Sequence, residues 1–235
     1  MEQPILITGA ARSGTSMVAG VINLCGAFGG DMSAGNRYNA KGMFENVNIR
    51  QNIVKPYLRA LGVDPNGQYP LPNIDTLPIP NNWKDTVENG MKNEGYKSGK
   101  WFYKGAKMCL HWPVWNHAFP DAKWIIVRRR TADIVNSCQK TGFMKAFNKD
   151  ANLRAIKAET EADGWLWWVH QHEKRWIEMI TKGLNVKVVW PERMVDGDYS
   201  QMKETIEWLG LEWNDEVYSF IEPKLYKARK WKGVK

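Results

Sequence analysis

A chain of 235 residues is long enough for one domain with a full hydrophobic core, so disulfides are not needed to hold it together. Its formal net charge of +8 favours anionic partners such as nucleotides or polyanions, and three cysteines without a C-x-x-C motif favour a reducing compartment. No apolar run reaches the ~20 residues of a membrane span, and a strand starting at Ile5 leaves no room for a signal peptide. We therefore expect a cytoplasmic protein without a membrane partner.

The first motif is a glycine-bounded turn between an apolar run and a helix. Residues 5–7 (ILI) predict a buried strand, residues 9–16 (GAARSGTS) a tight turn, and residues 17–25 a helix. Backbone N–H groups that point into such a turn, together with the positive end of the helix dipole, form a phosphate cradle. A turn that merely joins a strand to a helix is the alternative.

The charges in this turn are unsuited to ATP and Mg²⁺. The spacing from Gly9 to Gly14 follows the frame G-x-x-x-x-G-K-[S/T], but Thr15 stands where a nucleotide triphosphatase has Lys. The cation is Arg12, inside the loop. We therefore expect a phosphate loop that serves a different nucleotide.

Two irregular stretches flank a predicted helix. Gly, Asn and Ser dominate residues 28–46, which we expect to form a functional loop. The helix runs from residue 47 to about residue 61. Pro and Asn then exclude regular structure over residues 63–80, a composition typical of a lid or a binding wall. We expect a single domain over residues 1–235, with a loop-rich insertion at residues 63–100.

The remaining elements alternate between strands and helices. Strands are predicted at residues 101–104, 123–127 and 186–190, and helices at residues 83–94, 113–119, 131–141, 151–182 and 200–209. Such alternation predicts an α/β fold with a mainly parallel sheet flanked by helices.

A second cationic site is predicted where the strand at 123–127 ends. A phosphate-loop ATPase or GTPase normally has Asp there to help hold Mg²⁺, whereas this strand is followed by Arg128, Arg129 and Arg130. Guanidinium groups bind phosphate directly, without a metal. Ser137 lies eight residues after Arg129, close to two helical turns, so both side chains could reach one phosphate. Two phosphate sites indicate a nucleotide phosphorylated at both ends of its ribose. The alternative to a second phosphate site is that the three arginines pair with nearby acidic residues.

These motifs resemble those of sulfotransferases. Residues 7–22 resemble the family's 5′-phosphosulfate loop, commonly written P-[K/R]-S-G-T-[T/S]. Residues 119–138 resemble its 3′-phosphate motif, with Arg129 and Ser137 in register, and residues 186–211 are similar to its segment Y-E-D-L…F-L-G-L. The resemblance implies a P-loop NTPase-like α/β fold, 3′-phosphoadenosine-5′-phosphosulfate (PAPS) as donor, the bisphosphate PAP as product, and sulfuryl transfer to a hydroxyl or amine.

The resemblance also implies a role for each motif residue. The cofactor-binding residues that it implies are Arg12, Ser13, Gly14, Thr15, Ser16, Arg129 and Ser137. Arg12 further matches the catalytic Lys or Arg that neutralises charge on the phosphosulfate bridge as it breaks. Sulfuryl transfer needs an in-line acceptor and electrostatic relief of the leaving group. Since a sulfuryl group carries less charge than a phosphoryl group, we expect no metal.

The acceptor's proton needs a base. Residues 39–46 (NAKGMFEN) resemble the N-P-K-G-[Y/F]-[F/W]-E segment of bacterial and carbohydrate-type sulfotransferases, whose Glu is the usual candidate, so Glu45 is predicted as the general base. The alternative is that Glu45 only caps the helix at 47–61. His111 is the rival base, because cytosolic phenol and steroid sulfotransferases have a K-T-H motif at this stage of the chain; here the spacing from Lys107 is longer.

The sequence departs from the family at three places. Met17 stands where an aromatic residue often follows the loop, residues 190–193 (WPER) replace Y-E-D, and residues 229–233 (RKWKG) only partly match a C-terminal R-K-G. We expect a small-molecule or carbohydrate acceptor and no nucleic acid partner. His170 and His172 do not suggest a metal site, because alternate residues of a helix diverge by ~200°. A phosphate-loop kinase of small metabolites and a non-catalytic basic module that binds nucleotides or polyanions are the alternative functions.

Overall fold

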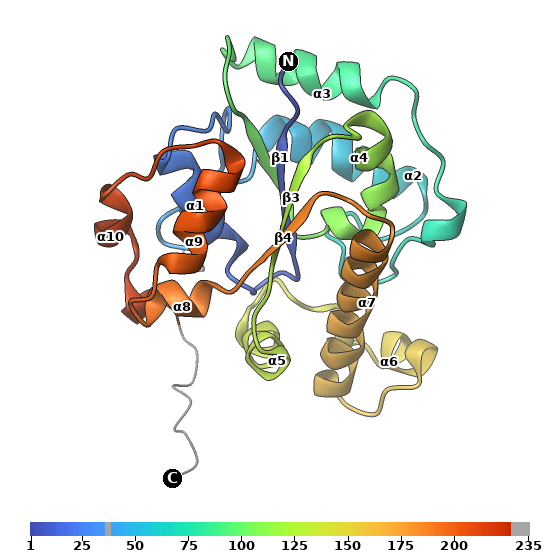
Figure 1. Cartoon of the computed structure of the whole chain (residues 1–235). Coiled ribbons are helices and arrows are strands. Elements are labelled where there is room, and N and C mark those ends of the chain that lie inside the picture. Colours follow the sequence, from blue (N-terminus) through green and yellow to red (C-terminus); the bar gives the residue numbers. More distant parts are fainter. Residues whose placement is uncertain (36–38, 227–235) are drawn as a thin grey trace.

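The computed structural model describes residues 1–35 and 39–226 of the chain (Figure 1). Four parallel strands form one sheet in the order β2-β1-β3-β4. Their bounds are Ile5–Gly9 (β1), Phe102–Lys104 (β2), Lys123–Val127 (β3) and Val186–Val189 (β4). Crossover connections between parallel strands put helices on both faces of the sheet. The predicted α/β fold with a parallel sheet is thereby confirmed.

The helices and short turns follow in chain order. The α-helices are α1 (Thr15–Leu24), α2 (Lys55–Ala60), α3 (Trp83–Asn93), α4 (Trp112–Ala118), α5 (Thr131–Lys140), α6 (Asp150–Ile156), α7 (Glu161–Thr181), α8 (Pro191–Val195), α9 (Ser200–Leu209) and α10 (Glu216–Phe220). A π-helix, η1 (Ile49–Val54), precedes α2, and the 3₁₀ turns are η2 (Ile74–Thr76), η3 (Met108–His111), η4 (Ala146–Asn148) and η5 (Pro223–Leu225). Helices α8 and α10 are additions to the sequence-based prediction.

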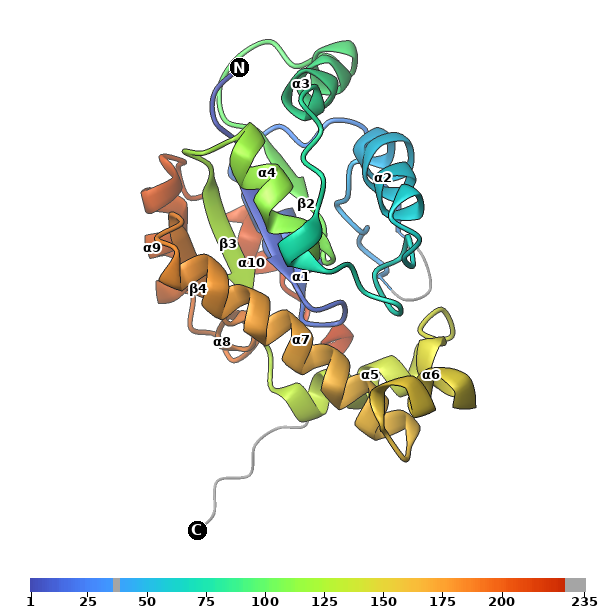
Figure 2. The ribbon, with the colours of Figure 1, turned by 90° about the vertical axis from the view of Figure 1, so that its right-hand side faces the viewer.

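Each face of the sheet supports its own hydrophobic core. Alternation along β1 sends Leu6 to one face and Ile5 and Ile7 to the other. Helices α1 and α9 cover one face, whereas α4 and α7 cover the other, which Figure 2 shows from outside. Aromatic side chains fill the second core, including the fully buried Trp115 and Trp165. All three cysteines are free and buried, as expected for a chain without disulfides.

The single long helix predicted at 151–182 is wrong. The chain forms two helices, α6 and α7, because Lys157 adopts a left-handed conformation with φ of 57° and ends α6. Thr160 then starts α7 through a capping box: its side chain accepts from the N–H of Asp163, whose carboxylate accepts from the N–H of Thr160. The capping residues that start a second helix are therefore present in the sequence, but they lie inside a long helical pattern that predicts one continuous helix.

The helix predicted at 47–61 is confirmed, but part of it is a π-helix. Residues 47–60 are helical throughout, and η1 occupies six of them. Pro56 explains the irregularity, because it has no N–H to donate to the carbonyl of Asn52 and its ring would clash with that carbonyl in a regular α-helix. The N–H of Lys55 bonds instead to the carbonyl of Arg50, five residues earlier. No helix in the described ranges is both long and apolar enough to cross a membrane.

Candidate active site

A pocket of about 760 Å³ opens where β1, β2 and β3 end. Carboxyl ends of parallel strands meet at one edge of a sheet, so the loops that follow them share the walls of this pocket. The loop after β1, the chain at 39–45, the end of β2 and helix α5 all line it. Among the described lining residues, eight are Lys or Arg and three are Asp or Glu. The pocket therefore suits an anionic ligand.

The loop after β1 has the conformation of an anion cradle. Arg12 and Gly14 both adopt left-handed backbone angles, with φ of 76° and 97°. A side chain at Gly14 would place its Cβ 2.8 Å from a carbon of Pro191, so only glycine fits. In the described structure no acceptor takes the N–H groups of Gly14, Thr15 and Ser16. These groups stand at the start of α1, beside the pocket.

Two serines of the loop have different surroundings. Ser16 lines the pocket and donates its hydroxyl to the carbonyl of Met43 (3.1 Å), which ties the loop to the chain at 39–46. Ser13 is fully buried and is absent from the lining, and its N–H donates to the carbonyl of Ala10 (3.1 Å). Ser13 therefore shapes the turn, while Ser16 faces the ligand space.

Three residues predicted from separate motifs come together. The Nε of Arg12 donates to the hydroxyl of Ser137 on α5 (3.0 Å), and a terminal nitrogen of Arg129 donates to the carbonyl of Arg12 (2.9 Å). The guanidinium of Arg129 also lies 4.5 Å from the ring centre of Tyr226. We refer to Arg12, Arg129 and Ser137 as the arginine–serine group. It brings the phosphate loop and the end of β3 to one side of the pocket.

The three consecutive arginines separate according to their partners. Arg128 forms an ion pair with Glu173 on α7 (2.5 Å), and Arg130 pairs with Asp133 (2.8 Å). Only Arg129 of the three lines the pocket. The alternative interpretation, pairing with nearby acidic residues, thus applies to Arg128 and Arg130, and Arg129 is the one of the three that the pocket exposes to a ligand.

Glu45 lies in the pocket and does not cap the following helix. Its side chain is 7% exposed, and one carboxylate oxygen lies 3.9 Å from the guanidinium of Arg50. The capping residue is Asn46, whose side-chain oxygen accepts from the N–H of Ile49 (2.8 Å). The carboxylate of Glu45 is therefore available to a ligand.

His111 is buried outside the pocket. It does not line the pocket, and its Nε2 accepts from the indole N–H of Trp115 (3.1 Å). The rings of Tyr57 and Trp83 pack against it. Burial in these aromatic surroundings and, to a smaller extent, the charge of Lys107 lower the pKa of His111 to about 3. Of the two residues predicted as possible bases, Glu45 lines the pocket and His111 does not.

Two pocket lysines were missed by the sequence analysis as site residues. Lys104 ends β2, beside Ile7 of β1, and is 3% exposed; Lys107 is 9% exposed. Burial lowers the pKa of both ammonium groups, the charge of Glu45 raises it, and the charge of Arg50 lowers it. A lysine that directly follows a buried apolar strand is the signal that could have identified Lys104.

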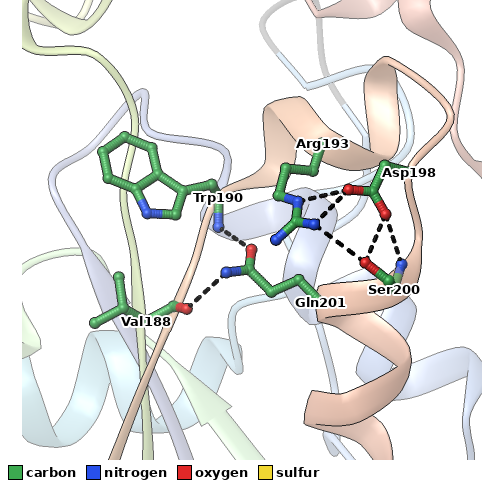
Figure 3. A network of polar contacts seen from close by, with 6 residues as sticks. All are labelled: Val188, Trp190, Arg193, Asp198, Ser200 and Gln201. Atoms are coloured by element: carbon green, nitrogen blue, oxygen red, sulfur yellow. Dashed lines mark hydrogen bonds and ion pairs between the residues drawn. The ribbon is translucent and has the colours of Figure 1, made fainter.

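A hydrogen-bond network holds residues 190–193, which follow β4 (Figure 3). The side chain of Gln201 accepts from the N–H of Trp190 (2.9 Å) and donates to the carbonyl of Val188 (3.3 Å). The Nε of Arg193 donates to Asp198 (2.7 Å). These contacts fix the short helix α8, whose first residue lies against the phosphate loop.

Within the described ranges, no group of three or more His, Cys, Asp or Glu side chains could hold a metal ion. His170 is exposed, whereas His172 is fully buried and its Nδ1 contacts the carbonyl of Trp168 (2.9 Å). The C-terminal prediction at 229–233 lies outside the described residues.

No family model and no curated protein matches the sequence. The fold is similar to that of two solved mycobacterial sulfotransferases. For STF1 from Mycobacterium tuberculosis H37Rv, the TM-score is 0.52 at 13% identity, over 94% of this chain and 70% of that one. For STF9 from Mycobacterium avium, the TM-score is 0.51 at 12% identity, over 93% of this chain and 66% of that one. At such identities the likeness concerns the fold, and it confirms the sulfotransferase-like α/β architecture predicted from the sequence.

Proposed function

We propose that the protein is a sulfotransferase that moves a sulfuryl group from PAPS to a hydroxyl or amine of a small-molecule or carbohydrate acceptor. The observation that carries this proposal is the arginine–serine group, which joins the phosphate loop to the end of β3. The similar fold of two sulfotransferases supports the same assignment.

The residues present fit a nucleotide with phosphates at both ends of its ribose. The N–H groups of Gly14, Thr15 and Ser16 would hold the 5′-phosphosulfate, as helix N-termini hold anions. Arg129 and Ser137 would hold the 3′-phosphate from the other side. PAPS supplies an activated sulfuryl group whose S–O bond to the 5′-phosphate breaks during transfer.

Glu45 and Arg12 would act on the two sides of that transfer. As the acceptor oxygen forms its new S–O bond, Glu45 takes the proton that this oxygen loses. Arg12 neutralises the charge on the 5′-phosphate oxygen from which the sulfuryl group departs. The buried Lys104, at the neighbouring strand end, adds an ammonium group to the lining of the same pocket.

The same positions disfavour a phosphate-loop kinase. Thr15 is 5% exposed and occupies the place of the lysine that such enzymes use on ATP phosphates. Arg128 follows β3 where the acid that helps hold Mg²⁺ would stand, and its guanidinium is paired with Glu173.

Nucleotide preference gives the first test. At a hundred times its dissociation constant, PAP without Mg²⁺ should stabilise the protein by about 2.7 kcal/mol. For a chain of this size, that corresponds to a rise in melting temperature of about 5–11 °C. ATP with Mg²⁺ should give little change. A shift with ATP and Mg²⁺ but none with PAP would contradict the proposal.

Turnover gives the second test, with radiolabelled PAPS and a panel of hydroxyl and amine acceptors. Glu45→Gln should lower transfer by about 10²–10⁴-fold, the usual contribution of a positioned base. Arg12→Ala should also abolish transfer. Glu88→Gln is the matched control, because Glu88 is 8% exposed but lies outside the pocket. An active Glu45→Gln variant would remove the assignment of the base.

A further inference from the structure

Three cationic side chains that line the pocket, those of Arg50, Lys55 and Lys107, have no role in the proposed binding of the nucleotide. The Nζ atoms of Lys55 and Lys107 form no hydrogen bond and no ion pair within 4.0 Å in the described structure. Lys107 is 9% exposed, and Gly67 packs directly over its side chain. The Nε of Arg50 is buried without a hydrogen-bond partner. Three cationic side chains thus line the same cavity with unused donors.

The π-helix explains how two of these cations come together. In an α-helix, residues five apart point about 140° away from each other, at 100° per residue. The N–H of Lys55 bonds to the carbonyl of Arg50, which is a π-type bond that brings these two residues nearer to one face of the helix. Both side chains line the pocket as a result. Such π segments are rare and frequently occur at functional sites.

The acidic residues of the pocket cannot balance this charge. Of the three that line it, Asp133 pairs with Arg130, and Glu222 pairs with Lys41. That leaves Glu45, one oxygen of which lies 3.9 Å from Arg50. Burying unpaired charge is costly, so a cluster of this kind is stable chiefly when an anion enters it.

We propose that Arg50, Lys55 and Lys107 form a subsite for an anionic oxygen group of the acceptor, either a carboxylate, a phosphate or a sulfate ester. The acceptor would accordingly be an anionic molecule, held by this subsite with its reacting hydroxyl or amine near Glu45. This inference rests on the proposed sulfotransferase function and names the acceptor class for it.

The electrostatics of the lysines agree with this assignment. Burial lowers the pKa of Lys55, and so does the nearby charge of Arg50. Burial also lowers the pKa of Lys107, and the charges of Lys55 and Arg50 lower it as well. A bound anion would oppose these effects and stabilise the ammonium forms.

The test is a calorimetric titration of PAP-saturated protein with inorganic phosphate at constant ionic strength. PAP blocks the nucleotide's own phosphate sites, so phosphate reports the remaining subsite. Wild type should show one saturable site. Lys55→Gln and Lys107→Met should each weaken it about tenfold or more, as for the loss of one charge-assisted hydrogen bond. Parallel titrations with acetate and sulfate show which anion the subsite prefers.

The control is Lys84→Gln, which removes an exposed lysine of α3 outside the pocket and should bind phosphate like wild type. Lys107→Met removes a buried charge and should keep the fold, which its melting curve checks. Wild type without saturable binding of phosphate, acetate or sulfate, or variants that bind as tightly as wild type, would overturn the subsite while PAP binding still stands. Failure of PAP to bind wild type would overturn the proposed function, and the inference with it.

Discussion

Replacing Lys104 by Met is expected to make the protein more stable at neutral pH and inactive in transfer. Lys104 is 3% exposed at the end of β2 and forms no ion pair within 4.0 Å in the described structure. Burial, the largest effect, lowers the pKa of the Lys104 ammonium. The charge of Glu45 raises this pKa and the charge of Arg50 lowers it, and the net shift is downward. The charged form is therefore less favourable in the folded protein than in the unfolded chain.

The size of the effect follows from the loss of this unpaired charge. Moving a polar group out of water costs about 1–3 kcal/mol in mutational data, and methionine occupies similar space without the charge. Gaining about 1–3 kcal/mol would raise the melting temperature by about 2–4 °C per kcal/mol. At a pH between the pKa of Lys104 in the folded protein and its pKa in the unfolded chain, Lys104 is protonated mainly in the unfolded chain. In that pH range the free energy of unfolding of the wild type therefore rises with pH. The advantage of Lys104→Met is thus largest at neutral pH and shrinks toward about pH 10.4.

Urea unfolding at neutral and alkaline pH measures the gain in stability and its pH dependence, and transfer from radiolabelled PAPS measures the loss of activity. Lys84→Met is the control, because an exposed lysine should change stability by no more than about 0.5 kcal/mol. A Lys104→Met variant less stable than wild type at neutral pH would show that attraction to Glu45 outweighs burial. That result would refute the reasoning.

Three further predictions concern the loop, the 3′-phosphate contact and the buried histidines. Gly14→Ala should cost about 1–3 kcal/mol and prevent PAP binding in calorimetry, whereas Gly26→Ala, with a similar φ of 98° but open space, should leave binding intact. Arg129→Lys should weaken PAP about tenfold or more but leave adenosine 5′-phosphosulfate, which lacks the 3′-phosphate, unaffected in the same assay. Stability in urea should fall as pH drops from about 6.5 toward 4. Burial lowers the pKa of His111 to about 3 and that of His172 to about 4, so in this pH range the unfolded chain binds more protons than the folded protein. A urea midpoint that does not change with pH would contradict this prediction.

The fold, and the positions of the loop after β1 and of Arg129 in the pocket, were predictable because their signals are local. A buried strand, two glycines and a helix start are contiguous in the phosphate loop, and each has its own backbone requirement. The spacing from Arg129 to Ser137 is likewise set within one strand end and one helix. It selected the one arginine of three that lines the pocket.

The proposed anion subsite was less predictable, because it depends on contacts between distant segments of the chain. No local sequence pattern indicates that Lys107 is buried. It is buried because the loop around Gly67 packs over it. Trp168 of α7 holds that loop by donating to the carbonyl of Gly67 (2.9 Å). The π-helix is equally hidden, since Pro56 indicates an irregular helix but not the direction in which Arg50 then points.

The distribution of cations addresses a difficulty that an anionic acceptor would raise. Two unit charges about 6 Å apart repel by about 2.8 kcal/mol at an effective dielectric constant of about 20. An anionic acceptor brought up to an anionic donor would meet such repulsion at the moment of transfer. Arg12 and Arg129 lie where we propose that the donor binds, whereas Arg50, Lys55 and Lys107 come from other elements and form the proposed subsite of the acceptor. With separate cations for the donor and for the acceptor, the pocket can hold both anions together, and Glu45, the proposed base, lines the same pocket.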